Sequence, residues 1–416
     1  MKPISFSPSS PSTSLSTALE DEVRLVVKNF LTLDNIEFSL GKLTIFIGPQ
    51  AEGKSLLAKL VDFFYESLSS AIYHEDYKGL KDSIRTRFLR IFPKRIWENG
   101  EFYIEFTMAT YVISIKYSKR RLYIKLNQIL EKDVRRIFSH KKEMEKNDPS
   151  NIFSWLNQNL PDIPYPLKLR SIFIPALRQM FSYASFEGFV YNIAYNREDV
   201  DYVLFKFASE LPFYRQFWEN DSEQARDAFN KSVSKILKGK YYQNQRKSFI
   251  INKKEQQIPV SLASSGQQEA LPLLLHTRLR FSNIFIIEEP EAHLFPSSQK
   301  DLAGYLCHKL NSLNASRMIV TTHSPYVLSS FNNFIAAYEV LNKNEEIISE
   351  MEKVIPRSYW ISYSDVQCFF VENGKAIPMM NDEYRMIDFD RIDACSDSIV
   401  KEYSSVMKIL NSDEEY

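Results

Sequence analysis

The chain has little of several features that would place it in a specialised class of protein. Its three cysteines (Cys307, Cys368 and Cys395) are odd in number and lack metal-type spacing, so neither a disulfide framework nor a zinc site is indicated. No uninterrupted apolar run approaches the roughly 20 residues that a membrane-spanning helix needs. Its 52 basic and 52 acidic residues leave no net charge, so contact with nucleic acid would need a local basic patch. We expect a reduced, cytoplasmic protein without a membrane partner.

The N-terminal segment also lacks structure-forming residues. Residues 1–20 are rich in Ser and Pro and contain no apolar stretch, which favours a disordered leader over a signal peptide. The whole chain is 44% apolar and 14% aromatic, enough for one large or two smaller packed domains. We therefore expect a globular protein after the leader.

Glycine is scarce, with ten in 416 residues, yet two of them belong to one short motif. The segment is Gly48-Pro49-Gln50-Ala51-Glu52-Gly53-Lys54-Ser55. It follows an apolar, strand-like run at 43–47 and precedes a helical pattern that starts at Leu56. In that context G-x-x-x-x-G-K-S predicts a loop whose N–H groups, with those of the following helix, bind phosphate oxygens. Lys54 would bind the β- and γ-phosphates of ATP, and the Ser55 hydroxyl would bind Mg²⁺.

A second motif, Ser264-Ser265-Gly266-Gln267, opens another helical pattern. Serine hydroxyls and an unobstructed glycine backbone at a helix N-terminus form a donor set that suits a γ-phosphate. By itself, the same string is equally typical of a plain turn that caps a helix.

Two more candidates follow apolar strands. Glu288 and Glu289 come directly after Ile284–Ile287, at the strand end where parallel sheets bind ligands. We expect Glu288 to bind Mg²⁺ and Glu289 to orient and deprotonate the attacking water, although an acidic pair can also be a solvated turn. His323 follows the strand-like run 318–321 and would contact the γ-phosphate; a lone histidine in such a place is more often structural.

The strand and helix patterns suggest an order of segments along the chain. Strands at 23–30, 35–40 and 43–47 precede an expected antiparallel meander at 102–126, a short strand at 171–175 and a helical region at 185–238. A strand–helix–strand pattern returns from residue 284. We predict an α/β protein with an N-terminal lobe (21–75), an inserted region (76–250), a second core segment (251–335) and a small C-terminal αβ appendage (336–416).

Taken in order, these motifs resemble those of the ATP-binding-cassette ATPases, in the branch that includes RecF, SMC-like proteins and the overcoming-lysogenization-defect (OLD) nucleases. The resemblance implies a core with a mixed sheet flanked by helices and a large α+β insertion. It also implies a Walker A loop at 48–55, a signature motif at 264–267, a Walker B strand ending at Glu288 and a switch histidine at His323. Residues 291–296 are similar to the D-loop, and residues 173–178 to the IPAxR element of phage-defence members.

In that family each ATP lies between the Walker A loop of one subunit and the signature of another. The resemblance therefore implies a homodimer, or a higher homo-oligomer, that closes on ATP and opens after hydrolysis. At three positions this sequence differs from the residues usual in the family's motifs. Ala51 replaces a usual glycine at a position that favours positive φ, Glu52 places a carboxylate beside the phosphates, and Glu288 stands where the wider family has Asp. We expect weak affinity or slow hydrolysis, with Glu52 pointing away from the nucleotide. Gln179 is the candidate Q-loop residue.

A nuclease domain of the OLD type is not expected in the tail. Glu372 and Asp388 resemble parts of a TOPRIM metal site, but only 15 residues separate them, too few for the intervening helix and strand. The chain is more similar to stand-alone phage-defence ATPases, such as AriA of PARIS and PtuA of Septu, which work with a separate nuclease or toxin. We therefore predict an ATP-dependent sensor or scaffold that regulates such an effector in bacterial anti-phage defence.

The alternative is a RecF- or SMC-like ATPase of DNA repair or recombination. A local basic patch before the signature could follow a DNA backbone, although a solvated face explains it equally well. The patch comprises Lys231, Lys235, Lys238, Lys240, Arg246, Lys247, Lys253 and Lys254. A transporter ATPase subunit fits less well, because of the large insertion and the Glu288–Pro296 segment.

Overall fold

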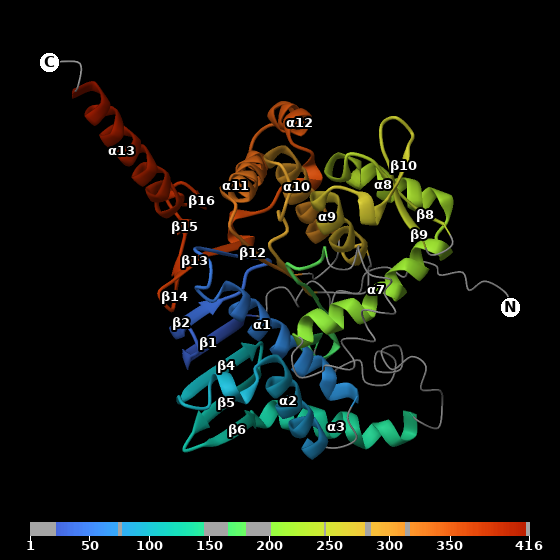
Figure 1. Cartoon of the computed structure of the whole chain (residues 1–416). Coiled ribbons are helices and arrows are strands. Elements are labelled where there is room, and N and C mark those ends of the chain that lie inside the picture. The colour runs from blue at the N-terminus through green and yellow to red at the C-terminus, as the bar shows by residue number, and fades with distance from the viewer. Residues whose placement is uncertain are drawn as a thin grey trace.

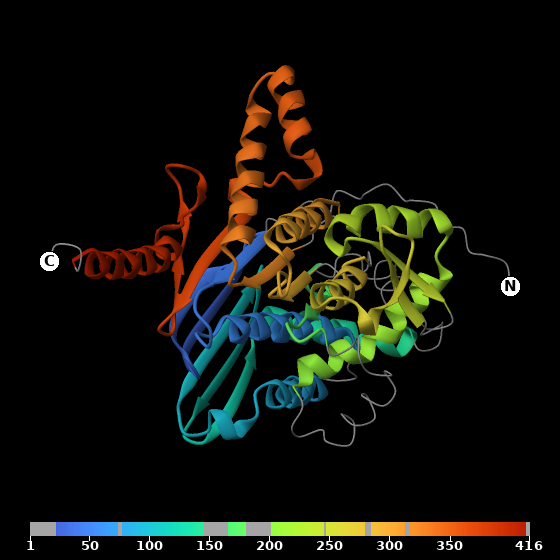
Figure 2. The ribbon, with the colours of Figure 1, turned by 45° about the horizontal axis from the view of Figure 1, so that its top comes forward.

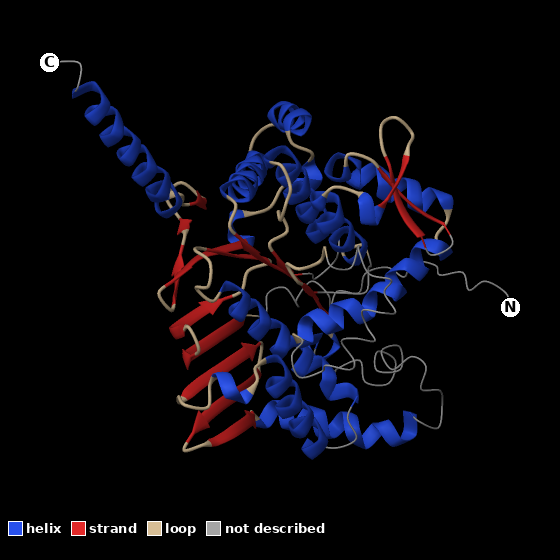
Figure 3. Cartoon of the chain, viewed as in Figure 1, coloured by secondary structure: helices blue, strands red, loops and turns tan. Residues whose placement is uncertain are grey.

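The computed structural model describes residues 22–73, 77–144, 165–179, 201–244, 247–278, 284–312 and 317–412. The expected leader, Arg246 of the basic patch and part of the expected helical region (185–200) lie outside these ranges. Two large sheets with helices between and around them confirm the predicted α/β architecture, a mixed sheet flanked by helices (Figure 1, Figure 3). Within the described ranges, no helix has both the length and the apolar character needed to cross a bilayer.

The central sheet has six strands, and all neighbouring pairs are parallel except the pair at one edge. Its strands, in spatial order, are β14 (Lys375–Pro378), β13 (Val366–Glu372), β3 (Leu43–Ile47), β12 (Arg317–Thr322), β11 (Ile284–Glu288) and β7 (Ser171–Ile174). Successive side chains of β3, β12 and β11 enter two different hydrophobic cores. Because both faces are covered, the inner residues of these strands are mainly apolar, as is usual for parallel strands.

The second sheet is antiparallel and confirms the predicted meander. Its spatial order is β2 (Leu33–Ser39), β1 (Val23–Phe30), β4 (Phe102–Met108), β5 (Tyr111–Ser118) and β6 (Arg121–Leu126). In β4 and β5 every second residue is buried, which is the alternation expected of a sheet with one face on the core.

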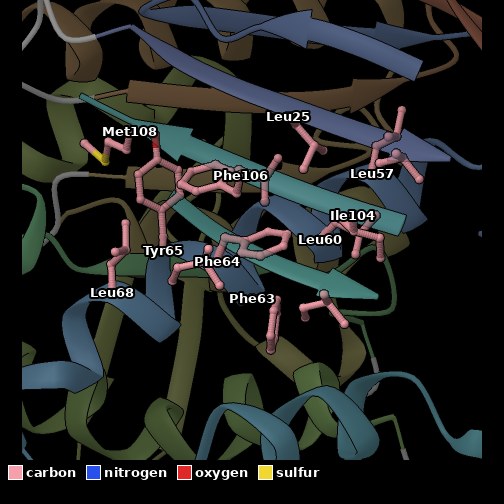
Figure 4. Packing of buried hydrophobic residues seen from close by; sticks show 14 of the residues in the cluster. Leu25, Leu57, Leu60, Phe63, Phe64, Tyr65, Leu68, Ile104, Phe106 and Met108 are labelled. Carbon is pink, nitrogen blue, oxygen red and sulfur yellow. The ribbon is translucent and has the colours of Figure 1, made fainter. Parts of the chain in front are cut away.

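Helix α1 (Lys54–Ser69) begins at the phosphate loop and lies between the two sheets. Figure 4 shows its apolar side chains against strands of the antiparallel sheet, where Phe64 stacks on Phe106 with ring centroids 5.1 Å apart. Other α1 residues pack with Phe46 and Ile319 of the central sheet in the same core. Eleven of its sixteen residues are buried, among them Lys54, so the start of this helix is held in place from both sides.

Most of the remaining helices pack around the two sheets, and others project from them (Figure 2). Those packed on the central sheet opposite α1 are α9 (Ser265–His276), α10 (Pro296–Ser312) and α11 (Pro325–Glu339). The others are α2 (Tyr77–Ile91), α3 (Gln128–Met144), α7 (Tyr202–Asn220), α8 (Glu223–Leu237), α12 (Glu345–Val354) and α13 (Asp390–Ser412). A small sheet has the order β10 (Gln257–Pro259), β9 (Lys247–Ile251), β8 (Lys240–Asn244), and β15 (Met380–Asn381) pairs with β16 (Met386–Ile387). Figure 2 shows the α11–α12 hairpin and α13 projecting from the body.

Two parts of the expected domain organisation differ from the structure. The tail is more than an appendage, because β13 pairs in parallel with β3 and so completes the central sheet. The inserted region also shares both sheets, since β4 pairs with β1 and β7 pairs with β11. Strand pairing is made by backbone groups of segments far apart in the chain, and no local pattern specifies such partners.

Candidate active site

Three of the sequence motifs meet at one edge of the central sheet. The ends of β3, β12 and β11 are in register, with Ile47 opposite Thr322 and Thr321 opposite Glu288. The phosphate loop, the predicted switch histidine and the second carboxylate of the acidic pair directly follow these strands. Because the strands are parallel, all three segments lie at the same carboxyl edge, where α/β sheets bind ligands.

The phosphate loop has the backbone conformation that its glycines predict. Gly48 has φ 149°, and a β-carbon there would lie 2.2 Å from the carbonyl oxygen of Val371. Gly53, with φ 103°, caps the N-terminus of α1 in the left-handed region. Ala51 also adopts a left-handed conformation, with φ 64°, so the position where glycine is usual does require positive φ. The alanine there costs about 1 kcal/mol of strain.

Lys54 is buried within the loop that it is predicted to serve. Its side chain is 5% exposed, and its ammonium donates hydrogen bonds to the carbonyl oxygens of Gly48 (2.8 Å) and Pro49. Burial lowers the pKa of Lys54, while the carboxylate of Glu289 acts in the opposite direction. A cation with so little water around it would gain strongly from an anionic phosphate in the loop.

Glu288 lies beside the first turn of α1 and has the properties of a metal ligand. It is 6% exposed, its Oε2 accepts a bond from the backbone N–H of Ala176 (3.3 Å), and its Oε1 has no partner among the described residues. Burial raises the pKa of Glu288, whereas Lys59 and a hydrogen bond from Ser55 act to lower it. A buried carboxylate oxygen left without a donor, next to a serine hydroxyl, suits a hard cation.

The oxygens of Ser55 and Glu288 suit Mg²⁺ better than a metal ion whose ligands all come from the protein. Across the described ranges, no group of three or more His, Cys, Asp or Glu side chains is arranged to hold an ion. Mg²⁺ is commonly bound by one or two protein oxygens and completes its shell with water and substrate phosphates. Ser55 and Glu288 supply such a pair.

Glu289 and His323 form a second polar pair at the same edge. Oε1 of Glu289 lies 3.2 Å from Nε2 of His323, and both side chains are partly exposed, at 39% and 32%. Glu289 has φ 42°, a left-handed conformation that costs a non-glycine residue about 1–3 kcal/mol, and its backbone N–H donates to the carbonyl of Thr321 (2.9 Å). The pair combines a proton acceptor with access to water.

Glu291 holds the backbone of His323, a contact that the sequence does not predict. Its buried carboxylate accepts hydrogen bonds from the hydroxyl of Thr322 (2.6 Å) and from the backbone N–H of His323 (2.8 Å). In the sequence, its similarity to a D-loop position is one signal at this residue. Its place between a buried strand and a helix is another, because a glutamate buried there needs hydrogen-bond partners.

The signature-like segment opens α9 as predicted. The Ser264 hydroxyl accepts a bond from the backbone N–H of Gln267, whose side chain bonds back to Ser264, so the two form a capping box. A β-carbon on Gly266 would lie 2.7 Å from the carbonyl of His293, so α9 is pressed against the D-loop-like segment. Ser264 and Ser265 are exposed, and their binding of a phosphate stays a prediction.

Two further predictions concern residues outside these motifs. Glu52, expected to point away from the nucleotide, accepts a 2.6 Å hydrogen bond from the backbone N–H of Asn373 in the β13–β14 turn. The side chain of Glu52 therefore joins the phosphate loop to the tail, a contact that the motif itself does not predict. The amide of Gln179 donates to Gln268 of α9 (2.9 Å), and its Q-loop role stays a prediction.

Comparison with protein families matches residues 115–328, more than half of the 416 residues, to the AAA ATPase domain. The chain belongs to this family. The matched span of this AAA ATPase includes the acidic pair, His323 and α9, and membership implies nucleotide binding. Comparison with curated proteins finds no match.

The AAA ATPase is also similar to three solved structures of SMC heads. The SMC head domain from Thermotoga maritima is 12% identical, with TM-score 0.38, over 86% of this chain and 97% of that chain. An SmcHead bound to the C-winged helix domain of ScpA is 12% identical, with TM-score 0.44, over 85% and 95%. An Smc head domain bound to the C-terminal domain of ScpA, derived from Pyrococcus furiosus, is 10% identical, with TM-score 0.40, over 90% and 98%.

Proposed function

We propose that this AAA ATPase binds and hydrolyses ATP, closes as a homodimer around two ATP molecules, and so regulates a separate nuclease or toxin in bacterial anti-phage defence. The observation that carries the hydrolytic part is the Glu289–His323 pair, 3.2 Å apart, at the sheet edge where the phosphate loop ends. A carboxylate open to water beside a phosphate-binding loop is what general-base hydrolysis requires.

The residues at this edge divide the chemistry among them. The loop N–H groups and Lys54 would bind the β- and γ-phosphates, and Ser55 and Glu288 would hold Mg²⁺. The chemistry that a bound Mg²⁺ would supply is neutralisation of negative charge on the phosphate oxygens. Glu289 accepts the proton of the attacking water, while His323, whose backbone Glu291 holds, contacts the γ-phosphate.

Glu289→Gln tests the hydrolytic assignment. An amide cannot accept the proton of water, so we expect turnover to fall about 1,000-fold while MgATP binding is retained. Phosphate release and fluorescent-nucleotide titration would measure the two quantities. The control is Glu339→Gln, which removes a partly exposed carboxylate of α11 that pairs with Arg385, and it should behave as wild type. Wild-type turnover in the Glu289 variant would mean that another group activates the water.

Dimer formation is supported by the surface around the start of α9. Leu262, two residues before the capping serine, is 75% exposed, and so is Phe295, which follows the segment packed on Gly266. Two large apolar side chains in water beside exposed serine donors suit a surface that a second copy covers. We infer that the signature of one copy completes the phosphate loop of the other.

The regulatory part of the proposal rests on the placement of the tail. The strand that carries Glu372, which superficially resembled part of a nuclease site, pairs with β3 in the ATPase sheet. This pairing makes Glu372 part of the ATPase sheet rather than of a nuclease site, and the proposal therefore assigns the effector to a separate chain. Phage plaque counts on cells carrying the gene with its neighbouring genes should rise to the undefended level when Lys54→Ala is introduced. Unchanged protection would contradict an ATP-dependent role in defence.

A group of exposed lysines supports the DNA-repair alternative. Exposed lysines of α8 and the β8–β9 hairpin, namely Lys231, Lys235, Lys240 and Lys247, lie in neighbouring elements that precede α9. DNA affinity that falls steeply with salt and disappears in a Lys238/Lys240/Lys247 triple alanine variant would favour that function. Co-purification with a nuclease from a neighbouring gene would favour the defence function.

A further inference from the structure

A fully buried arginine contacts several motifs of the proposed site without taking part in the chemistry assigned so far. Arg178 follows β7, and its side chain has no exposed surface. Its guanidinium donates to four backbone carbonyls: from Nε to Glu269 (3.0 Å), from Nη1 to Pro175 (2.9 Å) and Glu288 (2.6 Å), and from Nη2 to Glu289 (2.9 Å). The carboxylate of Glu269 lies 3.4 Å from Nε as an ion pair.

Two of these bonds restrain the backbone at Glu289. The carbonyl groups of Glu288 and Glu289 flank the Cα atom of Glu289, so holding both restricts φ and ψ of that residue. With φ at 42°, Glu289 is in a conformation that a residue with a β-carbon keeps only when its surroundings impose it. Without Arg178 the residue would relax to an ordinary conformation, and its carboxylate would turn away from His323.

The other bonds connect Arg178 to α9. Glu269 follows the signature-like residues by two positions, is 4% exposed, and meets Arg178 through both its carbonyl and its carboxylate. The planar guanidinium holds five N–H donors in fixed directions, whereas the ammonium of lysine has three donors on a single nitrogen and cannot reach the same set of carbonyls. One side chain therefore links the beginning of α9 to the end of β11.

We propose that Arg178 is a positioning residue that keeps Glu289 in the conformation needed for hydrolysis and makes that conformation depend on α9. The inference rests on the proposed function, because its consequence is a change in ATP turnover. A second copy that docks against the start of α9 acts on the hydrolytic carboxylate through Arg178. Hydrolysis is thereby linked to dimer closure.

The main test compares two arginine-to-lysine variants. Arg317 is the matched control, because it is also buried and donates to backbone carbonyls, those of Leu40 (2.8 Å) and Gly41 (3.1 Å), but at the opposite end of β12. Arg178→Lys should lower kcat about 100-fold, as expected for a displaced catalytic group, with MgATP affinity within threefold of wild type. Arg317→Lys should lower the melting temperature and leave kcat unchanged.

Two further variants separate positioning from a general structural role. In the Glu289→Gln background, Arg178→Lys should cause no further loss of single-turnover rate, since the group that it positions is already gone. Glu269→Gln keeps the bonds from Arg178 to the acidic pair and removes the ion pair to α9, and we expect roughly a fivefold lower kcat. If Arg178→Lys does not fold, the kcat of Glu269→Gln tests whether the contact between Arg178 and α9 affects hydrolysis.

The outcomes distinguish the inference from the function beneath it. A wild-type protein that binds MgATP without hydrolysing it would refute the proposed function, and this inference with it. If the wild-type protein hydrolyses ATP and folded Arg178→Lys has the same kcat, only the role of Arg178 is overturned. A further rate loss in the double variant would do the same, and an unchanged kcat in Glu269→Gln would overturn the link to α9.

Discussion

The phosphate-loop half of the site and the α9 half are built in opposite ways. Lys54 and Glu288 are 5% and 6% exposed and are held by loop carbonyls and neighbouring elements. At the start of α9, Ser264 and Ser265 are exposed, and the hydrogen bonds of Ser264 satisfy its own helix. The first half is assembled within one chain, whereas the second presents its donors outward, which agrees with two half-sites that meet between copies.

The largest effect should follow from damage to the enclosed half. Lys54→Ala removes the buried ammonium that would bind the β- and γ-phosphates, and we expect MgATP affinity to fall at least about 100-fold. Isothermal titration calorimetry would measure it. Lys42→Ala, at the other end of β3 and bonded to Asn311, is the control and should bind normally. Nucleotide affinity that survives in the Lys54 variant would remove this residue from the site.

Phe295→Asp addresses the outward-facing half. A carboxylate placed at an apolar contact must be desolvated on dimerisation, so we expect the ATP-dependent dimer to weaken by at least tenfold. The monomer should still bind MgATP. Light scattering after size exclusion, in the Glu289→Gln background, would report the assembly. Val354→Asp is a matched control, since Val354 of α12 is 74% exposed and lies away from α9. Equal dimerisation in both variants would place the interface elsewhere.

Glu52→Gln should have the smallest effect, and it tests how the Glu52 carboxylate affects the phosphate-loop half of the site. Removing a negative charge near the phosphates should strengthen ATP binding about two- to threefold. The bond to Asn373 becomes weaker, so the melting temperature should fall slightly. Glu37→Gln, which loses a surface ion pair with Arg24 on the antiparallel sheet, is the control and should leave ATP affinity unchanged. Weaker ATP binding in the Glu52 variant would contradict its placement.

Much of the local structure was predictable because its signals are contiguous. Alternating residues in β4 and β5, the apolar runs of β3, β11 and β12, and the loop around Lys54 all correspond to the structure. The positive φ of Ala51 also followed from its place in the motif. These features depend on neighbours within a few residues, which a single sequence displays directly.

The partners of distant segments were not predictable. β13 was assigned to an appendage, although its run of buried apolar residues is typical of a central parallel strand. The bonds from Glu52 to Asn373 and from Arg178 to Glu288 and Glu289 join residues more than a hundred positions apart. Nothing in the residues near Arg178 indicates which carbonyls its guanidinium meets.

The sequence by itself determined the phosphate loop, the strands that carry the acidic pair and His323, and the helix that begins at Ser264, because each depends on short-range backbone preferences and on periodic burial. Only the tertiary structure decided that the tail enters the central sheet, that Glu52 holds the β13–β14 turn, and that Arg178 connects α9 to Glu289. The bonds of Arg178 satisfy buried carbonyl groups, and the partners in all three contacts are set by packing in three dimensions.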